Sequence, residues 1–289
     1  MQNNFGTKNP ISIPAKAGEK IIQKYHFGSE SGVADAENLD SFKNLKNLLT
    51  SAHAPQDIDG IRLNIASESK RFRDYSISVI KKFIDSLMFF PNIRKMNMHF
   101  PPKRWVKATQ HEGNMGKYSI MIDSIFNIGS YADDHDIKLV LENLNSYWWD
   151  NEIPDDIHFD DVDWGSKNEA FGMSPEEWIQ ICEDVNHANV KLCLDSSHVC
   201  TYAHRFSSEK REERVMSFLS RPELIDHVHW SDNYLYDLKG RRDSHLLVGD
   251  GSLPRNLHQK IKNLDATILL EHYYDESGLI KELDFIEKL

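Results

Sequence analysis

The sequence lacks long apolar runs and has few cysteines. No apolar run approaches the ~20 residues that a membrane-spanning helix needs. The polar start from Met1 to Lys8 also lacks the apolar stretch of a secretory signal. The chain has three cysteines, and Cys182, Cys193 and Cys200 form no CxxC pair. This excludes a disulfide scaffold, and we expect a cytoplasmic protein in a reduced compartment with no membrane partner.

Basic residues and several common motifs are also scarce. The 289 residues include 34 Lys and Arg against 45 Asp and Glu, a net charge of −11. This balance disfavours a general nucleic-acid-binding surface, because phosphate contacts need clustered basic side chains. It does not exclude a local basic groove. The sequence has no Gly-rich phosphate loop and no G-x-S-x-G element, so neither a P-loop site nor a serine hydrolase elbow is expected.

Short apolar runs alternate with amphipathic stretches along most of the chain. The runs typical of strands are 95–99, 137–143, 190–195, 226–230 and 267–271. The stretches typical of helices are 69–90, 115–133, a segment from Ser174, 207–219, a segment after Pro254, and 279–289. Continuous apolar strands between helices indicate βαβ units and a buried parallel sheet.

The helix predicted from Ser174 has the clearest start signal. Ser174, Pro175 and Glu177 occupy the N-cap, first-turn and capping-box positions. We therefore expect the helix to begin there.

Two regions depart from the regular alternation. Residues 11–14 and 21–26 are expected to form strands one and two, with so little chain between them that the first βα unit must be abbreviated. Residues 145–170, after the fifth strand, form a long acidic loop rich in aromatics. Long loops in compact domains are often functional lids, and a surface insertion packed by its own aromatics is the equal alternative.

Polar residues stand at the carboxyl end of five apolar runs. They are His99, Glu142, Asp195, His229 and Glu271. A doubly wound open sheet binds ligands at one switch point, whereas a closed barrel builds its site from many strand ends. We therefore predict an α/β protein with a (β/α)8 TIM barrel. A barrel of this kind has roughly 250 residues, so we treat residues 1–289 as a single domain.

Several carboxylates buried together must be neutralised by cations or protons. Imidazoles beside them complete the mixed nitrogen and oxygen set that suits zinc, manganese or iron. The sequence therefore predicts a divalent metal centre at the carboxyl face of the barrel.

A series of motifs resembles the xylose isomerase-like barrel superfamily, which holds sugar isomerases and epimerases as well as the endonuclease IV family of abasic-site nucleases. The similarity covers about residues 50–289. The motifs are SAHAP (51–55), LNIAS (63–67), MHFPP (98–102), LEN (141–143), LDSSH (194–198), HVHWSDN (227–233), DSHLLVGDG (243–251) and LLEHY (269–273).

The resemblance to the endonuclease IV pattern implies up to three metal sites. Each site is assigned by the match of this sequence to the family motifs. The implied ligand sets are His53, His99 and Glu142 for the first; Glu142, Asp195, His229 and Glu271 for the second; and His198, Asp243 and His245 for the third.

Departures from the nuclease pattern favour the sugar branch. Gln56 replaces the usual Tyr after the HAP motif, and Phe100, Pro101 and Pro102 replace a Gly and a second His. The usual Leu-Asn-Asp after the seventh-strand His is Trp230, Ser231 and Asp232 here. Several of these loops would contact DNA in the nucleases.

Two enzymatic functions follow from the resemblance. The first is an isomerase or epimerase that acts on a sugar or sugar phosphate through an enediolate, with one zinc or manganese ion, Glu142 and Glu271 as acid and base, and His198 orienting a hydroxyl. Lys103, Arg241 and Arg242 are candidates for phosphate binding, with a solvated surface as the simpler interpretation. Trp105 is a further candidate for substrate contact.

The alternative is an endonuclease IV-like phosphodiesterase with up to three zinc ions and abasic DNA as its substrate. Lys103, Arg104 and Trp105 would then form the basic rim. A third hypothesis is a non-catalytic barrel with a closed, structural metal. We predict the sugar isomerase or epimerase.

Overall fold

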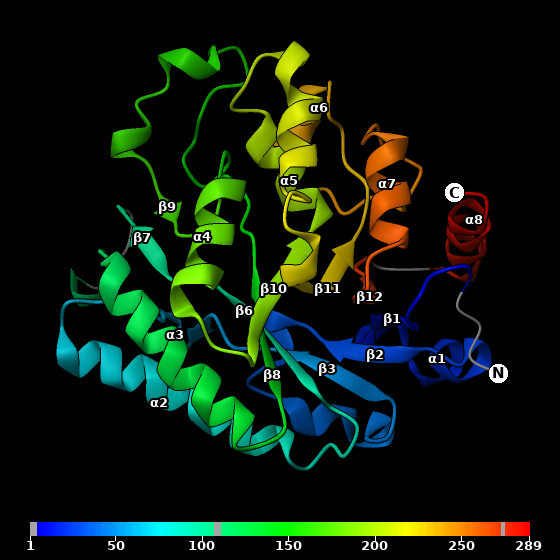
Figure 1. Ribbon diagram of the computed structural model, residues 1–289, viewed down its shortest axis with the longest axis horizontal. Helices are drawn as coiled ribbons and strands as arrows, with labels where there is room; N and C mark the ends of the chain where they lie inside the picture. The colour runs from blue at the N-terminus through cyan, green and yellow to red at the C-terminus, as the bar shows by residue number, and fades with distance from the viewer. Residues whose placement is uncertain (1–4, 107–110, 273–274) are drawn as a thin grey trace.

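The computed structural model describes residues 5–106, 111–272 and 275–289. The first four residues of the polar start and Tyr273 of the last motif lie outside the described residues. Within the described part of the chain, eight parallel strands close into a barrel (Figure 1), with the last strand paired to the first. In barrel order they are β1 (Ile11–Pro14), β2 (Gly28–Ser31), β3 (Leu49–His53), β6 (Lys95–His99), β8 (Lys138–Glu142), β10 (Val190–Asp195), β11 (Ile225–Trp230) and β12 (Thr267–Leu270). The predicted TIM barrel is confirmed.

Helices surround the strands on the outside of the barrel (Figure 1). They are α1 (Glu19–Tyr25), α2 (Lys70–Leu87), α3 (Tyr118–Asp133), α4 (Pro175–Val185), α5 (Ser196–Ala203), α6 (Ser208–Ser217), α7 (Arg255–Lys262) and α8 (Glu276–Glu287). Each predicted helix is present, with ends that differ by at most three residues from the predicted ones. Helix α4 begins as expected, because the Ser174 hydroxyl accepts a hydrogen bond from the backbone N–H of Glu177. The predicted capping box is only half formed, since the Glu177 carboxylate accepts from Gly172 N instead.

The amino-terminal part of the barrel is abbreviated, but not in the way the sequence predicted. Residues 21–26 were expected to form strand two and instead lie mostly in helix α1, a helix of seven residues. Ile21, Ile22 and Tyr25 have helical spacing and pack toward the core. The second strand is Gly28–Ser31, a short polar sequence that strand propensity does not identify.

Side chains of one strand alternate between the barrel interior and the helix layer. On β11, His227 and His229 face inward, where both contact Glu30 of β2. Trp230 faces outward, and its indole N–H donates to His258 of α7. The barrel interior therefore contains charged and polar side chains, and the apolar core lies mainly between strands and helices.

The long segment after β8, residues 145–170, is packed by its own aromatic side chains. Trp148 is buried and donates its indole N–H to the carbonyl of Thr201. The ring of Trp164 meets Trp148 edge-on at 5.0 Å, and the guanidinium of Arg205 lies 3.9 Å from the centre of the Trp164 ring. The segment ends in β9 (Glu169–Ala170), which pairs with β7 (Pro102–Arg104). These contacts favour the packed insertion over a mobile lid.

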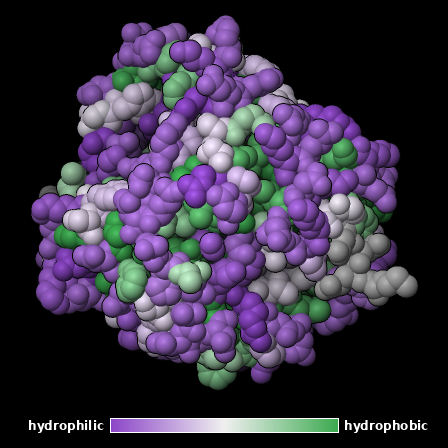
Figure 2. Space-filling model, viewed as in Figure 1, coloured by the Kyte–Doolittle hydropathy of each residue, from purple (hydrophilic) through white to green (hydrophobic). Residues whose placement is uncertain are grey.

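One face of the molecule is largely hydrophilic (Figure 2). On the face shown in Figure 2, hydrophobic residues form small groups between hydrophilic ones. None of the helices in the described ranges combines the length and the apolar character that crossing a membrane requires.

Candidate metal centre

The strand ends bring all nine predicted ligands to one end of the barrel. Each of the six barrel strands β3, β6, β8, β10, β11 and β12 contributes at its carboxyl end or in the connection that follows. The residues are His53 at the end of β3, His99 on β6, Glu142 on β8, Asp195 on β10, His198 in the first turn of α5, His229 on β11, Asp243 and His245 in the connection after β11, and Glu271 after β12.

The potential ligand atoms form three overlapping groups, in each of which these atoms lie within 4.8 Å of one another. The groups are His53, His99 and Glu142; Glu142, Asp195, His229 and Glu271; and Asp195, His198 and His245. The first two groups contain the same residues as the first two ligand sets that the resemblance implied. The third has Asp195 in the place expected for Asp243, whose carboxylate instead contacts His198 Nε2 at 3.0 Å and His245 Nε2 at 2.9 Å.

His53 and His99 each present one ring nitrogen to Glu142. His53 Nδ1 donates to the carbonyl of Ala54, so its Nε2, 3.2 Å from Glu142, is the nitrogen with a lone pair. His99 Nδ1 is hydrogen-bonded to the Gln56 side-chain oxygen, and its Nε2 lies 3.4 Å from Glu142. The residue that departs from the nuclease pattern, Gln56, thus orients a candidate ligand.

His198 and His245 follow the same arrangement around Asp243. His198 Nδ1 donates to the carbonyl of Asn143, and His245 Nδ1 donates to the carbonyl of Glu271. In both rings the Nε2 atom is left to face the Asp243 carboxylate. A partner on one nitrogen that fixes the tautomer of the other is the usual arrangement of metal-binding histidines.

The fifth histidine, His229, is oriented by a residue that the sequence interpretation missed. Its Nε2 lies 3.0 Å from Glu30, and its Nδ1 lies 2.8 Å from Glu271 and 3.5 Å from Glu142. Glu30 escaped notice because strand two was placed too early in the chain. The only sequence feature that could have pointed to Glu30 is a lone Glu in a stretch of glycine and serine, and this is a weak signal.

The imidazoles stabilise the ionised form of Glu142. Burial alone would raise the pKa of this carboxyl group, but the neighbouring imidazoles, His229 first among them, outweigh burial and hold the pKa well below 4.5. Burial lowers the pKa of His99 to about 4, so this ring is neutral. The pKa of His229 is raised well above 6.5, because nearby acidic groups, Glu271 and Glu142 among them, outweigh its burial.

The groups around Asp195 are also strongly perturbed. Burial raises the pKa of Asp195 to about 7. The pKa of His198 is raised to about 10, because Asp195 and Asp243 outweigh the burial of the ring. Partial burial would raise the pKa of Glu271, yet His229 and His245 lower it to about 2. Such clustered shifts are typical of functional sites.

Three buried atoms of the second group test whether these residues fit a cation. Among the described residues, Asp195 Oδ2, His229 Nδ1 and Glu271 Oε2 are buried without a hydrogen-bond partner. His229 Nδ1 and Glu271 Oε2 approach within 2.8 Å, yet their directions do not make a hydrogen bond. Buried atoms of this kind are costly unless something binds them. Two carboxylates and an imidazole are suitable ligands for zinc or manganese, so the residues fit a divalent ion.

A further group, Cys193, His227 and His229, is less suitable for a metal. Burial raises the pKa of the Cys193 thiol, which opposes the thiolate form that binds metals. Glu30 already bridges His227 and His229. All three cysteines are free and buried.

The four predicted substrate-binding residues lie in different settings. Lys103 lies 3.3 Å from Glu177, and Trp105 meets the ring of Tyr147 edge-on at 5.2 Å.

Arg241 is only 7% exposed, and its guanidinium donates to the carbonyls of Pro154, Asp155 and Ile157. Arg242 is exposed and stacks on Trp149 at 3.8 Å. The simpler interpretation of a solvated surface therefore does not hold for Arg241.

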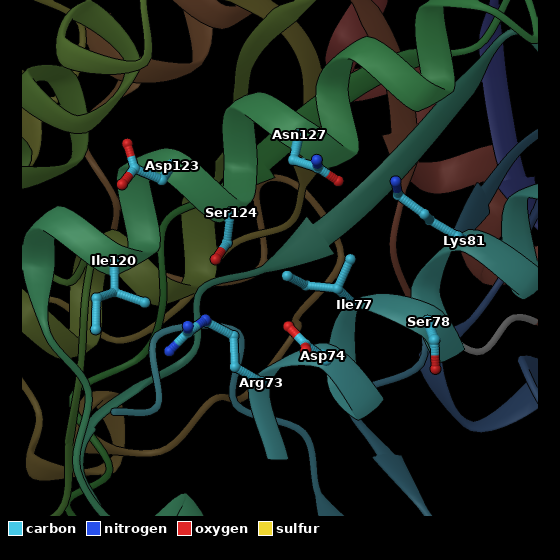
Figure 3. Close-up of a pocket in the computed structure, with 9 residues that line it drawn as sticks. All are labelled: Arg73, Asp74, Ile77, Ser78, Lys81, Ile120, Asp123, Ser124 and Asn127. Atoms are coloured by element: carbon cyan, nitrogen blue, oxygen red, sulfur yellow. The ribbon is translucent and has the colours of Figure 1, made fainter. Parts of the chain in front are cut away.

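One hollow of about 320 Å³ opens beside the centre and contains Trp149, Arg242 and Asp243 among its lining residues. A larger hollow of about 440 Å³ lies between α2 and α3 (Figure 3), where side chains such as Arg73, Asp74 and Asp123 line it. None of the predicted ligands lines the hollow in Figure 3.

Comparison with known proteins gives one family and several similar chains. A family model described as "Xylose isomerase-like TIM barrel" matches residues 31–289. An uncharacterized protein of Methanocaldococcus jannaschii is 21% identical over 285 residues, which cover 93% of this chain and 83% of the relative.

Solved structures with the same fold include sugar epimerases. A D-tagatose 3-epimerase-like protein is 19% identical with a TM-score of 0.59, covering 96% of this chain and 98% of its own. D-psicose 3-epimerase from Clostridium cellulolyticum, solved with D-tagatose, is 13% identical with a TM-score of 0.60 and coverage of 96% and 97%. A Thermus thermophilus protein soaked with ZnCl2 is 16% identical with a TM-score of 0.60 and coverage of 96% of both chains.

Proposed function

The chain belongs to the xylose isomerase-like TIM barrel family, and from this premise we propose that it is a metal-dependent isomerase or epimerase acting on a sugar or sugar phosphate through an enediolate. The observation that carries the proposal is the second group of ligands, Glu142, Asp195, His229 and Glu271, which includes three buried atoms without a hydrogen-bond partner. The sugar epimerases among the structural neighbours support the substrate class. The neighbour soaked with ZnCl2 supports zinc as one candidate ion.

The proposed chemistry divides between an ion and two glutamates. A divalent ion held by this group would supply Lewis-acid polarisation of a substrate carbonyl. Glu271 has a side chain 31% exposed and a pKa lowered to about 2, so it is ionised and accessible to accept a proton. Glu142, nearly fully buried and held by Asn97 and the histidines, would hold the proton on the other side.

His198 and Arg242 would bind the rest of the substrate. His198 Nδ1 is committed to the Asn143 carbonyl, so its Nε2, 3.0 Å from Asp243, is the nitrogen that would orient a hydroxyl. Arg242 lines the hollow that also contains Asp243, and it is the best placed of the predicted bases to bind a phosphate. Arg241 instead serves the segment 145–170, and Lys103 is paired with Glu177.

The endonuclease IV-like phosphodiesterase remains the second candidate, because one observation favours it. Glu142 belongs to two ligand groups, and a third group surrounds His198 and His245. That arrangement would suit up to three zinc ions. The proposed DNA rim is weaker, since Arg104 is bound to Trp164 O, Lys167 O and Glu169.

The first experiment measures hydrogen exchange between solvent and the carbon-bound hydrogens of sugars by NMR in deuterated water. Metal-loaded wild type should catalyse exchange with at least one ketose or ketose phosphate in a panel. Glu142→Gln and Glu271→Gln should each lower the rate by about 10²–10⁴-fold, because each removes a proton-transfer group.

The matched control is Glu212→Gln, on the outer helix α6, where Glu212 accepts only from Tyr236 in the described hydrogen bonds. It should exchange at the wild-type rate. Wild-type rates in both site variants would contradict the proposal. Cleavage of abasic DNA without any sugar exchange would replace it by the second candidate.

A further inference from the structure

Beneath the ligand groups, the barrel interior contains a buried carboxylate between two imidazoles. Glu30 is 2% exposed, and its two oxygens lie 2.9 Å from His227 Nε2 and 3.0 Å from His229 Nε2. His227 and His229 are 1% and 0% exposed. An arrangement this dry is stable only where every hydrogen bond is made in the right direction.

The contacts of His227 continue to a lysine at the far end of the barrel. Lys95 Nζ can only donate, and it donates to Thr267 Oγ1 at 2.8 Å. The Thr267 hydroxyl lies 2.7 Å from His227 Nδ1, closer than its other acceptor, the Asp226 carbonyl at 3.3 Å. The hydroxyl can donate to either atom, and the shorter contact favours His227 Nδ1; a neutral His227 then carries its ring hydrogen on Nε2, facing Glu30.

Glu30 accepts from both rings because it is ionised. Its two oxygens each face a ring nitrogen at hydrogen-bond distance, and in a carboxyl–imidazole pair the hydrogen stays on the ring, because the reference pKa of a carboxyl group lies about two units below that of an imidazole. An ionised carboxylate has no hydrogen to give, so His229 Nε2 must carry one. The Asn97 amide nitrogen is farther from that atom, at 3.4 Å, and it donates to Glu142.

The consequence reaches the candidate metal centre. With its hydrogen on Nε2, His229 turns Nδ1 toward Glu271 and Glu142, where that atom has no hydrogen-bond partner among the described residues. A bound cation would take the place of any hydrogen on Nδ1, while Glu30 keeps the hydrogen on Nε2 in place. Such second partners typically change metal affinity by 10–100-fold.

We propose that Glu30, itself aligned by His227, Thr267 and Lys95, is a positioning residue that fixes His229 as an Nδ1 ligand and sets the affinity of the centre for a divalent ion. The inference rests on the metal centre of the proposed function, but not on the reaction. It assigns a role to the chain of contacts that runs from His229 through Glu30, His227 and Thr267 to Lys95, which we call the relay.

The test is the affinity for Co²⁺, measured by competition with a coloured chelator on the full chain freed of metal. Glu30→Gln keeps the size of the side chain, but its amide can accept from only one ring and carries no charge. It should weaken Co²⁺ binding by about 10–100-fold. Thr267→Val removes the hydroxyl one step farther away and should give a smaller loss than Glu30→Gln.

Val228→Ala is the matched control for lost stability. Val228 is fully buried on β11 between the two histidines but lies outside the relay. Its melting temperature should fall while its Co²⁺ affinity stays near that of wild type. Equal affinities for Glu30→Gln and Val228→Ala would overturn the inference. If Glu30→Gln does not fold, the Co²⁺ affinity of Thr267→Val is compared with that of Val228→Ala instead.

A spectroscopic readout separates positioning from a structural role. In long-range ¹H–¹⁵N spectra of the Zn²⁺-loaded protein, His229 should have its hydrogen on Nε2 and its metal-shifted nitrogen at Nδ1. Ligation through Nε2 would overturn the inference. If wild type binds Co²⁺ with the affinities and the His229 tautomer described but exchanges no sugar hydrogen, the proposed function is contradicted and the role of Glu30 is supported. If wild type binds no ion, the role of Glu30 is overturned.

Discussion

At the level of single residues, the five clustered histidines illustrate how a ligand set is prepared before any ion binds. Each ring has one nitrogen committed to a fixed partner and the other turned toward a carboxylate. The partners are the carbonyls of Ala54, Asn143 and Glu271, the amide of Gln56 and the carboxylate of Glu30. Because the partners determine the tautomers, little reorganisation is required on binding.

A histidine outside the centre allows a clean prediction of pH-dependent stability. His204 is 1% exposed and donates from Nε2 to the Tyr234 carbonyl, while its buried Nδ1 has no partner in the described residues. Burial lowers its pKa from 6.5 to about 4. A histidine with a lowered folded pKa contributes stability above pH 6.5 and loses it as the pH falls toward 4. The loss should be on the order of 3 kcal/mol.

The measurement is urea unfolding of the metal-free protein at several pH values between 7 and 4, for wild type and His204→Gln. Glutamine can still donate to the Tyr234 carbonyl but does not titrate. The variant should therefore lose less stability than wild type over this range. Parallel pH curves for the two proteins would show that His204 does not titrate as proposed.

At the level of elements, two arginines hold the long segment after β8. Arg241 donates to three backbone carbonyls of the segment, and its guanidinium lies 4.2 Å from the centre of the Trp148 ring. Arg205, just after α5, stacks on Trp164. The segment borders the hollow beside the centre, so these contacts shape the access to it.

Arg241→Ala should lower the free energy of unfolding by about 3 kcal/mol and make residues 145–170 sensitive to protease. Arg241→Lys should behave similarly, because an ammonium group cannot reproduce a planar fork of donors to three carbonyls. Denaturant unfolding and limited proteolysis measure the two effects. Arg242→Ala, its exposed neighbour, should change stability by less than about 0.5 kcal/mol. If Arg241→Ala were as stable as Arg242→Ala, the segment would not depend on this contact.

Strands and helices with a clear apolar pattern could be predicted from the sequence, and those without one could not. β8 and β10 are continuous apolar runs that end in a charged residue, so both the strands and the ligands Glu142 and Asp195 were evident. β2 is Gly-Ser-Glu-Ser, which has neither apolar character nor β-branched residues, while the two isoleucines of α1 imitate a strand. The misplaced strand hid Glu30, and no sequence pattern indicated that it would lie across the barrel from His229.

At the level of the whole molecule, the barrel concentrates negative charge at one end. Glu30, Glu142, Asp195, Asp243 and Glu271 converge there, in a chain whose net charge is already −11. The histidines offset part of this charge, three of them through strongly raised pKa values. A cation that binds only the folded chain must therefore stabilise it.

Removal of that cation should lower the stability of the folded chain, and the number of bound ions should distinguish the two candidate functions. At a free ion concentration of about 1,000 times Kd, binding contributes about 4 kcal/mol to stability. For a chain of this size that corresponds to a fall in melting temperature of roughly 10 °C after chelation. Elemental analysis of gently purified protein gives the number and identity of the ions. One equivalent, particularly of manganese, fits the isomerase or epimerase, whereas two to three equivalents of zinc fit the phosphodiesterase.

His245→Ala distinguishes these outcomes more sharply than the count alone. His245 belongs to the group around Asp195 and His198 but not to the group that contains Glu142 and Glu271. A single-ion enzyme should keep its equivalent and most of its chelation-dependent melting shift in this variant, because the second group is intact. A three-zinc enzyme should lose one equivalent and keep the others. Complete loss of metal would show that the groups form one indivisible centre, and both stoichiometric models would then be wrong.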